Sequence, residues 1–403
     1  MRQSATRQTT AQLTAVARTF IVFVLVAAGE TQLAVAAWTI EPVDLSGQAG
    51  PRTIIELDST NNPQAAYFSG AGVAYSIRTG GTWSSQGIVT DGQTFALDNG
   101  DLPFFATRSA PSFGLVLNRR LPDGSLIPNP ITSAPVGQSM WLGFDSQNRP
   151  HLAYTNTLTQ LLRHAVFDGS TWNIQTVATD PNFQFQFSSF AAALDANDQV
   201  HFAWDTSANG PMKYARPSGA GWQIQSIPNT GDGFVNDMLI DDQGNVQLAL
   251  DLFTGQILTG GLHYDIYDGT TWTLERVPGL DSFVGSNAQL MLDPGGEPHF
   301  LTFDSDFIGP NELKHVYRSG ANWNSELITS WDGPNNGPLA ATSDGWRIHA
   351  LYVDDQQNVY YATSFVPEPH SLGLILIALI ASGSLCQLPR RIYSLQHSVA
   401  DSL

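Results

Sequence analysis

Four histidines stand at equivalent places along this chain. They are His151, His201, His299 and His349, and glutamine takes the same place in two other units, as Gln64 and Gln247. A ring of imidazoles is a ligand set for a transition metal. Histidine and glutamine share a different property, since both donate a hydrogen bond to a neighbouring carbonyl. Because the position recurs and accepts either residue, we interpret these side chains as structural parts of a repeated fold.

Four aspartates are better candidates for a binding site. They are Asp205, Asp251, Asp304 and Asp354, and each stands where a short apolar strand gives way to a loop. Several carboxylates on one face are the ligands that Ca²⁺ prefers, because this hard cation takes six to eight oxygens. The alternative is that aspartate simply ends strands and begins turns. No turn matches the calcium-loop pattern D-x-[DN]-x-[DN]-G with its distant glutamate. We therefore expect no cofactor, with Ca²⁺ as the one ion that fits.

Aromatic residues stand in loops that we expect on the same face as these aspartates. Phe183 and Phe185 alternate with glutamines, and Trp331 stands in another such loop. Aromatic rings beside Asp, Asn and Gln are typical of sugar-binding sites, where apolar sugar faces stack and hydroxyls are hydrogen-bonded. The alternative is that these rings fold back onto the strands. The sequence thus predicts a ligand-binding face made of the four aspartates, Phe183, Phe185 and Trp331.

The elements that position these residues repeat every 40–52 residues. Each unit has four short strands of alternating polarity, an Asp turn after the first strand and a Trp at the start of the fourth. The Asp turns begin at Asp58, Asp98, Asp145, Asp195, Asp241, Asp293 and Asp344. The Trp strands begin at Trp38, Trp83, Trp172, Trp222, Trp272 and Trp323. Such units are typical of β-propeller blades. We predict an all-β, seven-bladed β-propeller of four-stranded antiparallel blades.

The two ends of the repeat do not match, and this mismatch predicts how the ring closes. The chain opens with the Trp strand 38–43, which has no turn before it, and its last unit has no Trp strand. We expect strand 38–43 to pair with residues 359–362, because pairing removes two exposed sheet edges. The second unit, about 95–132, lacks both the His and the Trp. Six blades with an inserted hairpin therefore stay open as an alternative.

The N-terminal segment is typical of an export signal. Arg2, Arg7 and Arg18 precede an apolar run over 20–28, and small residues follow at 34, 36 and 37. This order is that of a secretory signal peptide, and the run is too short to span a bilayer. We predict a signal peptide over 1–37 and a β-propeller domain over 38–365.

The C-terminal segment has three parts in order: Pro367, Glu368 and Pro369, then an apolar run over 372–386, then Arg390 and Arg391. This tail resembles the PEP-CTERM sorting signal of exported bacterial proteins. The resemblance implies a sorting signal over 366–391, a hydrophobic helix in the membrane before processing, and an exosortase-type enzyme as partner through Pro367, Glu368 and Pro369. Residues 392–403 form a short tail that such signals usually lack. A simple membrane anchor is the alternative, and both place the repeats outside the cytoplasm.

The net charge limits which classes of molecule the repeat region can bind. The net charge is −18, and residues 38–365 contain only two lysines and no cysteine. Nucleic acid is excluded as a partner because phosphate binding needs Lys and Arg. No nucleophile elbow, zinc-protease helix or phosphate loop is present. The sequence therefore favours a surface-retained binding module for extracellular polysaccharide or a surface protein. A polysaccharide-acting glycosidase or lyase and a purely structural envelope protein are the alternatives.

Overall fold

The computed structural model describes one compact unit, Trp38–Phe365, together with Val366. The described residues are 38–69, 72–109, 111–137, 139–156, 158–180, 190–206, 210–253, 260–280, 283–284, 287–305, 310–332 and 337–366. The predicted signal peptide and sorting signal lie outside them. Within these ranges, no helix is long and apolar enough to cross a membrane.

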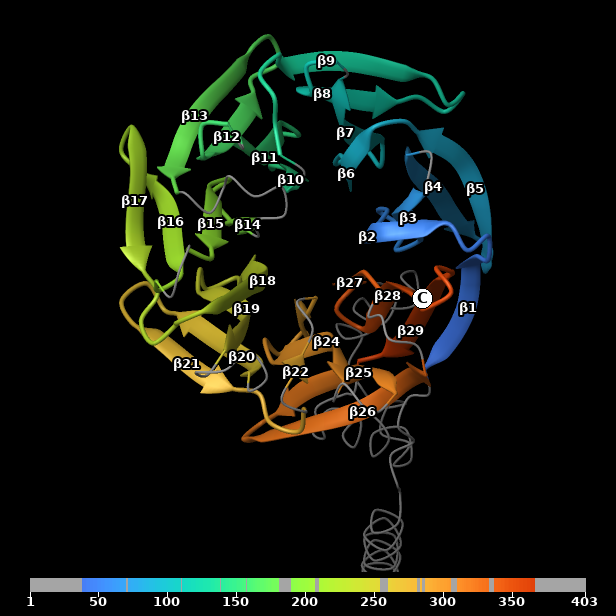
Figure 1. Cartoon of the computed structure of the whole chain (residues 1–403), viewed down its shortest axis with the longest axis vertical. Coiled ribbons are helices and arrows are strands. Elements are labelled where there is room, and N and C mark those ends of the chain that lie inside the picture. Colours follow the sequence, from blue (N-terminus) through green and yellow to red (C-terminus); the bar gives the residue numbers. More distant parts are fainter. Residues whose placement is uncertain are drawn as a thin grey trace, which may run out of the picture. The chain divides into compact units, whose positions relative to one another are not determined.

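Across the described residues, the strands form seven antiparallel sheets arranged as blades around a central axis (Figure 1). The innermost strands are β2 (Ala49–Leu57), β6 (Gly92–Leu97), β10 (Met140–Phe144), β14 (Phe190–Leu194), β18 (Gly233–Ile240), β22 (Phe283–Val284) with β23 (Gln289–Leu292), and β27 (Leu339–Ser343). The second strands are β3 (Pro63–Ser69), β7 (Pro103–Ser109), β11 (Pro150–Asn156), β15 (Val200–Trp204), β19 (Val246–Phe253), β24 (Pro298–Ser305) and β28 (Arg347–Val353). We number the blades 1 to 7 in this order.

The outer half of each blade completes this pattern. The third strands are β4 (Gly72–Thr79), β8 (Gly114–Arg120), β12 (Leu161–Phe167), β16 (Lys213–Ser218), β20 (Gly260–Tyr267), β25 (Asn311–Ser319) and β29 (Val359–Phe365). The outermost strands are β5 (Thr82–Val89), β9 (Leu126–Thr132), β13 (Trp172–Thr179), β17 (Gly221–Ser226), β21 (Trp272–Arg276), β26 (Asn322–Trp331) and β1 (Thr39–Asp44). The predicted seven-bladed propeller is confirmed, and blade 2 is a full blade rather than an inserted hairpin.

Ring closure occurs as the sequence predicts. Strand β1 pairs antiparallel with β29, from Thr39 opposite Thr363 to Asp44 opposite Val359, so blade 7 contains both ends of the ring (Figure 1). The Trp38 indole N–H donates to Glu326 Oε1 in blade 6 at 2.9 Å. On the other side, Arg78 of blade 1 forms an ion pair with Glu41 of β1. The closing strand is therefore joined to both neighbouring blades.

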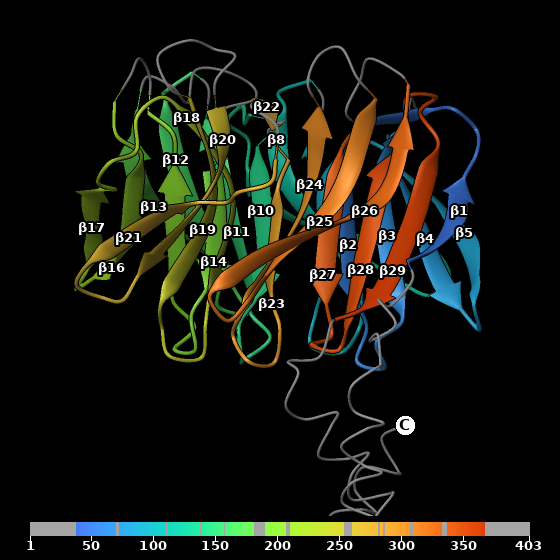
Figure 2. The same cartoon turned by 90° about the horizontal axis from the view of Figure 1, so that it is seen from below.

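Successive strands alternate in direction, which gives the ring two different faces (Figure 2). We define the turn face as the side that contains the Asp turns between first and second strands. We define the loop face as the opposite side, which contains the connections from second to third strands and from blade to blade. Strand β1 begins and β29 ends at the turn face, since Thr39 lies opposite Thr363. The chain thus enters and leaves the ring on the turn face.

The outer tryptophans connect neighbouring blades. Five of the six pack against the aromatic residue in the third strand of the preceding blade, with ring centroids 5.4–6.2 Å apart. The pairs are Trp38–His315, Trp83–Tyr361, Trp222–His164, Trp272–Tyr214 and Trp323–Tyr264. The sixth, Trp172, donates from its indole N–H to Asn129 Oδ1 of blade 2 at 3.0 Å. Such aromatic pairs add about 0.5–1.5 kcal/mol beyond the area they bury. All five third-strand partners are buried, so they form part of the core between blades.

Blade 2 lacks the Trp but keeps an arginine contact that blades 1 and 6 make beside theirs, through Arg78 and Arg318. The Arg120 guanidinium lies 5.3 Å from the centre of the Tyr75 ring of blade 1, and it donates to the Gln86 carbonyl at 2.6 Å. A cation over an aromatic face is an attractive contact. The weak second unit of the sequence thus keeps the arginine contact between blades without the Trp.

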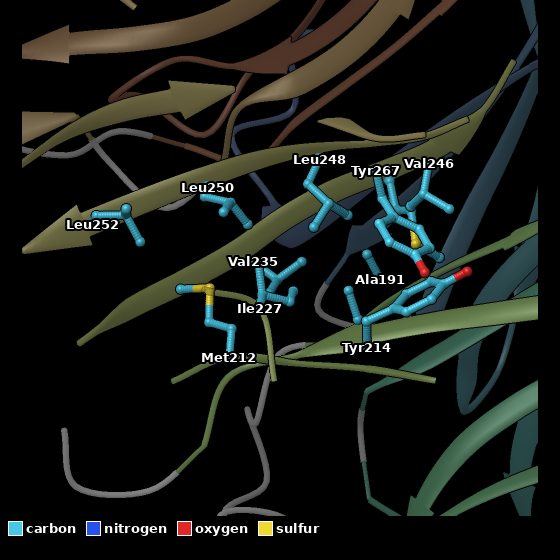
Figure 3. Close-up of a cluster of buried hydrophobic side chains, with 12 residues drawn as sticks. Ala191, Met212, Tyr214, Ile227, Val235, Val246, Leu248, Leu250, Leu252 and Tyr267 are labelled. Atoms are coloured by element: carbon cyan, nitrogen blue, oxygen red, sulfur yellow. The ribbon is translucent and has the colours of Figure 1, made fainter. Parts of the chain in front are cut away.

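The apolar core lies between the blades rather than within one layer. Figure 3 shows the cluster between blades 4 and 5, where Met212 and Tyr214 pack against Val235, Leu248 and Leu250. Similar clusters fill other blade interfaces. Because strand side chains alternate between faces, each blade contributes one face to each of two interfaces.

The recurring histidines are structural. His151 Nε2 lies 3.1 Å from Asp145 Oδ2 in its own turn, and its Nδ1 lies 3.1 Å from His164 Nε2 in the third strand. His201 likewise lies 2.5 Å from the Tyr214 hydroxyl. Gln64 and Gln247 accept from Tyr75 and Tyr264 in the same position. The side chain therefore joins the Asp turn to the third strand, and the structural interpretation is confirmed.

Removing the Trp38 side chain should weaken the contact between the closing strand β1 and blade 6. We expect Trp38→Ala to lower the free energy of unfolding by roughly 2 kcal/mol, less than the about 3–5 kcal/mol of a fully buried Trp, because Trp38 is partly exposed. Trp346→Ala is the matched control, since Trp346 is 59% exposed in a turn. Chemical denaturation measures both. Equal effects of the two substitutions would contradict closure through Trp38.

Acidification should destabilise the ring through its buried histidines. Burial and the nearby His315 lower the pKa of His299 from 6.5 to about 3. Between those values the unfolded chain binds protons that the folded chain does not, so the free energy of unfolding falls as the pH drops. His299→Gln keeps a partner for His315 and removes this titration. Its stability should fall less than that of the wild type from pH 6.5 to 3, and parallel curves would refute the assignment.

Candidate functional site

The predicted aspartates lie where the sequence places them, at the loop-face ends of second strands. Asp205 directly follows β15 and is 8% exposed. Asp251 in β19 and Asp304 in β24 are almost completely buried. Asp354 directly follows β28 and is partly exposed. Only Asp354 is therefore accessible to a ligand to any marked degree.

Asp304 has a structural partner. Its Oδ2 accepts a hydrogen bond from Lys314 Nζ at 2.6 Å, and Lys314 also lies 2.8 Å from Glu312. These ion pairs raise the pKa of Lys314 against the opposing effect of burial. The negative charge of Asp304 is therefore paired with a lysine of its own blade.

Asp354 caps its own turn. Its Oδ1 accepts from the backbone N–H groups of Gln356 at 2.9 Å and Asn358 at 2.8 Å. Asp58 bonds in the same way to Thr60 and Asn62 on the turn face. The alternative interpretation, that aspartate ends strands and begins turns, accounts for this residue.

Asp251 is less well satisfied. Among the described residues, neither carboxylate oxygen forms a hydrogen bond of normal geometry, although the Asn236 amide lies nearby. Burial raises the pKa of Asp251 to about 7, although the Asn236 amide lowers it in part. A carboxyl group in this state is neutral over much of the acidic range, which reduces the cost of burying it.

The four aspartates do not form a metal centre. Among the residues that the structure describes, no group of three His, Cys, Asp or Glu side chains is placed to hold a metal ion. Trp331 packs between blades 6 and 7, stacked on Tyr352 at 6.1 Å and edge-on to Phe303 at 5.5 Å. Phe183 and Phe185 lie outside the described residues. Among the described members of the predicted face, Asp354 and Trp331 are partly exposed, and the other three aspartates are buried.

A cavity of about 460 Å³ lies in the central channel instead. It is lined mainly by residues near the loop-face ends of the innermost strands, with one residue, Glu56, deeper along β2. Its polar lining includes Arg52, Glu56, Gln93, Thr94, Ser139 and Asn287, and its aromatic lining includes Phe95, Trp141 and Phe190. The volume is in the range of ligand pockets, which is about 300–1,000 Å³. The sequence does not single out these residues, because no short pattern shows that a strand is the innermost of its blade.

A second cavity of about 480 Å³ lies on the loop face between blades 1 and 7. It is lined by the turn Asp354 to Gln357 and by the starts of β2 and β27. Pro51 and Pro338 line both cavities, so the two adjoin. Asp354 therefore belongs to the rim of the channel site, on the face that the sequence predicts.

Gly143 leaves the space that the Trp141 indole occupies. A Cβ atom at Gly143, two residues along the same strand face, would lie 2.7 Å from the indole Cζ2 and Cη2 atoms. Trp141 also packs against the cluster between blades 3 and 4. The small residue lets the large ring lie flat against the strand at the channel wall.

The two charged residues of the channel differ in their surroundings. Burial, with repulsion from Arg108, lowers the pKa of Arg52 to about 10, and its guanidinium lies 5.7 Å from the centre of the Phe68 ring. Part of the Glu56 side chain is exposed to the channel. The surrounding protein removes most of the water around its carboxyl group, and this burial raises the pKa of Glu56 to about 7. Within the channel cavity, the described lining contains no tyrosine and no second carboxylate. Glycoside hydrolysis uses a pair of carboxyl groups, of which the described lining supplies one, Glu56.

Neither a protein-family model nor a curated protein sequence matches this chain. Among solved structures, an ulvan lyase of polysaccharide lyase family PL25, bound to -[GlcA(1-4)Rha3S]-, has a TM-score of 0.60 at 9% identity, covering 80% of this chain and 95% of its own. An inactive virginiamycin B lyase from Staphylococcus aureus, with quinupristin, has a TM-score of 0.54 at 10% identity, covering 81% and 99%. A streptogramin B lyase has a TM-score of 0.51 at 9% identity, covering 81% and 98%. These likenesses show the β-propeller fold alone.

Two asparagine substitutions separate the structural aspartate from the accessible one. We expect Asp304→Asn to lower the free energy of unfolding by about 1–3 kcal/mol, because it breaks a mostly buried ion pair with Lys314. Asp354→Asn should change it by less than about 0.5 kcal/mol, because Asn caps turns as well as Asp does. Thermal denaturation compares the two. A larger loss for Asp354→Asn would show that these roles are reversed.

Proposed function

We propose that this protein is an exported, surface-retained β-propeller that binds extracellular polysaccharide at its loop face. The observation that carries the proposal is the channel cavity, which is lined by Trp141 and Phe190 as well as by Gln93, Thr94 and Asn287. Aromatic faces stack on the apolar faces of sugar rings, and amides and hydroxyls bond to their hydroxyl groups. The adjoining cavity at Asp354 gives an extended ligand a path across the rim.

The arrangement of the ring supports retention at a surface. Both ends of the propeller leave from the turn face, so attachment through either end leaves the loop face open. In this proposal the signal over 1–37 directs export, and the tail with Pro367, Glu368 and Pro369 is the substrate of an exosortase-type enzyme. The ulvan lyase of similar fold is described with a bound saccharide, so a ring of this architecture can hold such a ligand.

A polysaccharide-acting enzyme is the second candidate, and one observation favours it. Burial raises the pKa of Glu56 to about 7, a value suited to a general acid or base near neutral pH. A glycan array with the full chain identifies ligands, and assays for new reducing ends or unsaturated sugars detect turnover. Binding without turnover supports the binding module, whereas turnover that Glu56→Gln abolishes would establish the enzyme. Silence on every glycan would refute both.

Substitution of the channel tryptophan tests the place of binding. We expect Trp141→Ala to weaken binding of an array-positive glycan about tenfold, which is about 1.4 kcal/mol, because one aromatic stacking face is lost. Gly143→Ala should also weaken it by displacing the indole. Trp346→Ala, at an exposed turn-face Trp, is the control. Calorimetry below the melting temperature of each variant measures the affinities. Weakening by Trp346→Ala alone would move the site to the turn face.

A further inference from the structure

Glu56 occupies a position that no other blade fills with a charged residue. In each blade, one innermost-strand residue lies opposite the recurring His or Gln position of the second strand. Glu56 lies opposite Gln64 in blade 1. The equivalent residues in blades 2 to 7 are Ala96, Gly143, Ala193, Leu239, Met291 and Thr342. A residue that recurs with the blades is explained by the fold, and Glu56 does not recur.

The fold gives Glu56 no structural partner. In contrast to Asp304, which pairs with Lys314, Glu56 forms no hydrogen bond or ion pair with any described residue, and burial is the sole cause of its raised pKa. Burying a carboxyl group without a partner lowers stability. An apolar residue, as in most other blades, would avoid this cost. Such a group facing a cavity is a candidate for ligand binding.

The surroundings of Glu56 favour a cationic ligand group. Glu56 lines a cavity whose lining also includes Trp141 and Phe190. Aromatic faces, Trp above all, attract cations. The only cation of the described lining, Arg52, is four residues earlier in β2, roughly 13 Å away along the strand. An ammonium group is small enough to reach the carboxylate past the rings, and its charge compensates the buried acid.

We propose that Glu56 binds an ammonium group, and that the polysaccharide taken by the channel therefore contains amino sugars with unacetylated amines. This inference rests on the proposed polysaccharide-binding function and specifies its ligand class. Charge pairing with an ammonium group lowers the pKa of the carboxyl group below about 7. At pH 6.5 the unliganded carboxyl is mostly protonated, so binding of the cation should release protons.

The test compares two matched ligands on the full chain at pH 6.5. Calorimetry in buffers of different ionisation enthalpy measures affinity and proton release for a glucosamine tetramer and for the N-acetylglucosamine tetramer. We expect the tetramer with unacetylated amines to bind at least about tenfold more tightly and to release protons. Glu56→Gln should remove both the preference and the proton release. Asp123→Asn, which removes the same charge from a turn between β8 and β9, should change neither.

Each outcome decides the proposal. Equal affinity for both tetramers, unchanged by Glu56→Gln, would overturn the ammonium site while supporting the polysaccharide-binding function. No binding of either tetramer, with a positive glycan array, would overturn the ammonium site and leave the function intact. Binding of a lysine-rich peptide but of neither tetramer would show a protein ligand instead. A melting temperature of Glu56→Gln at or above that of the wild type would support a residue kept for function rather than for stability.

Discussion

The contact between an outer tryptophan and the third-strand aromatic of the preceding blade is the interaction on which this ring depends. A single four-stranded blade cannot bury both of its faces, so each blade is stable only between two neighbours. Trp83 on Tyr361 and Trp38 on His315 extend the contact across the junction where the chain begins and ends. Closure by β1 removes the open edges that a linear array of blades would expose.

Much of this architecture was predictable because it repeats. The Asp turns and Trp strands identify the blades, and the unmatched strand 38–43 identifies the closure, since pairing and register follow from local patterns. The exchange of histidine with glutamine correctly indicates a structural role for His151 and His201. Blade 2 was harder to interpret, because it lacks the Trp and keeps only the arginine contact, Arg120 on Tyr75, that blades 1 and 6 make beside theirs.

The candidate site was less predictable, for a physical reason. Whether a residue faces the channel depends on the radial position of its strand, which no short pattern encodes. Register shifts in β2, β6 and β18 further break the alternation of side chains near the loop face. An aspartate at the end of a second strand, such as Asp304, lies within the blade, whereas Glu56 and Trp141 of innermost strands reach the cavity.

Function in this protein is therefore expected where the repeat is broken. Recurring residues stabilise the ring. In this account the residues that do not recur and that line the channel, above all Glu56 and Trp141, bind the ligand. Hydrogen–deuterium exchange of the full chain, with and without the glycan that binds most tightly on the array, tests this claim most directly. The account predicts slower exchange at the loop-face starts of β2, β6 and β10 around the channel. Protection confined to the outermost strands or to the Asp turns would contradict it.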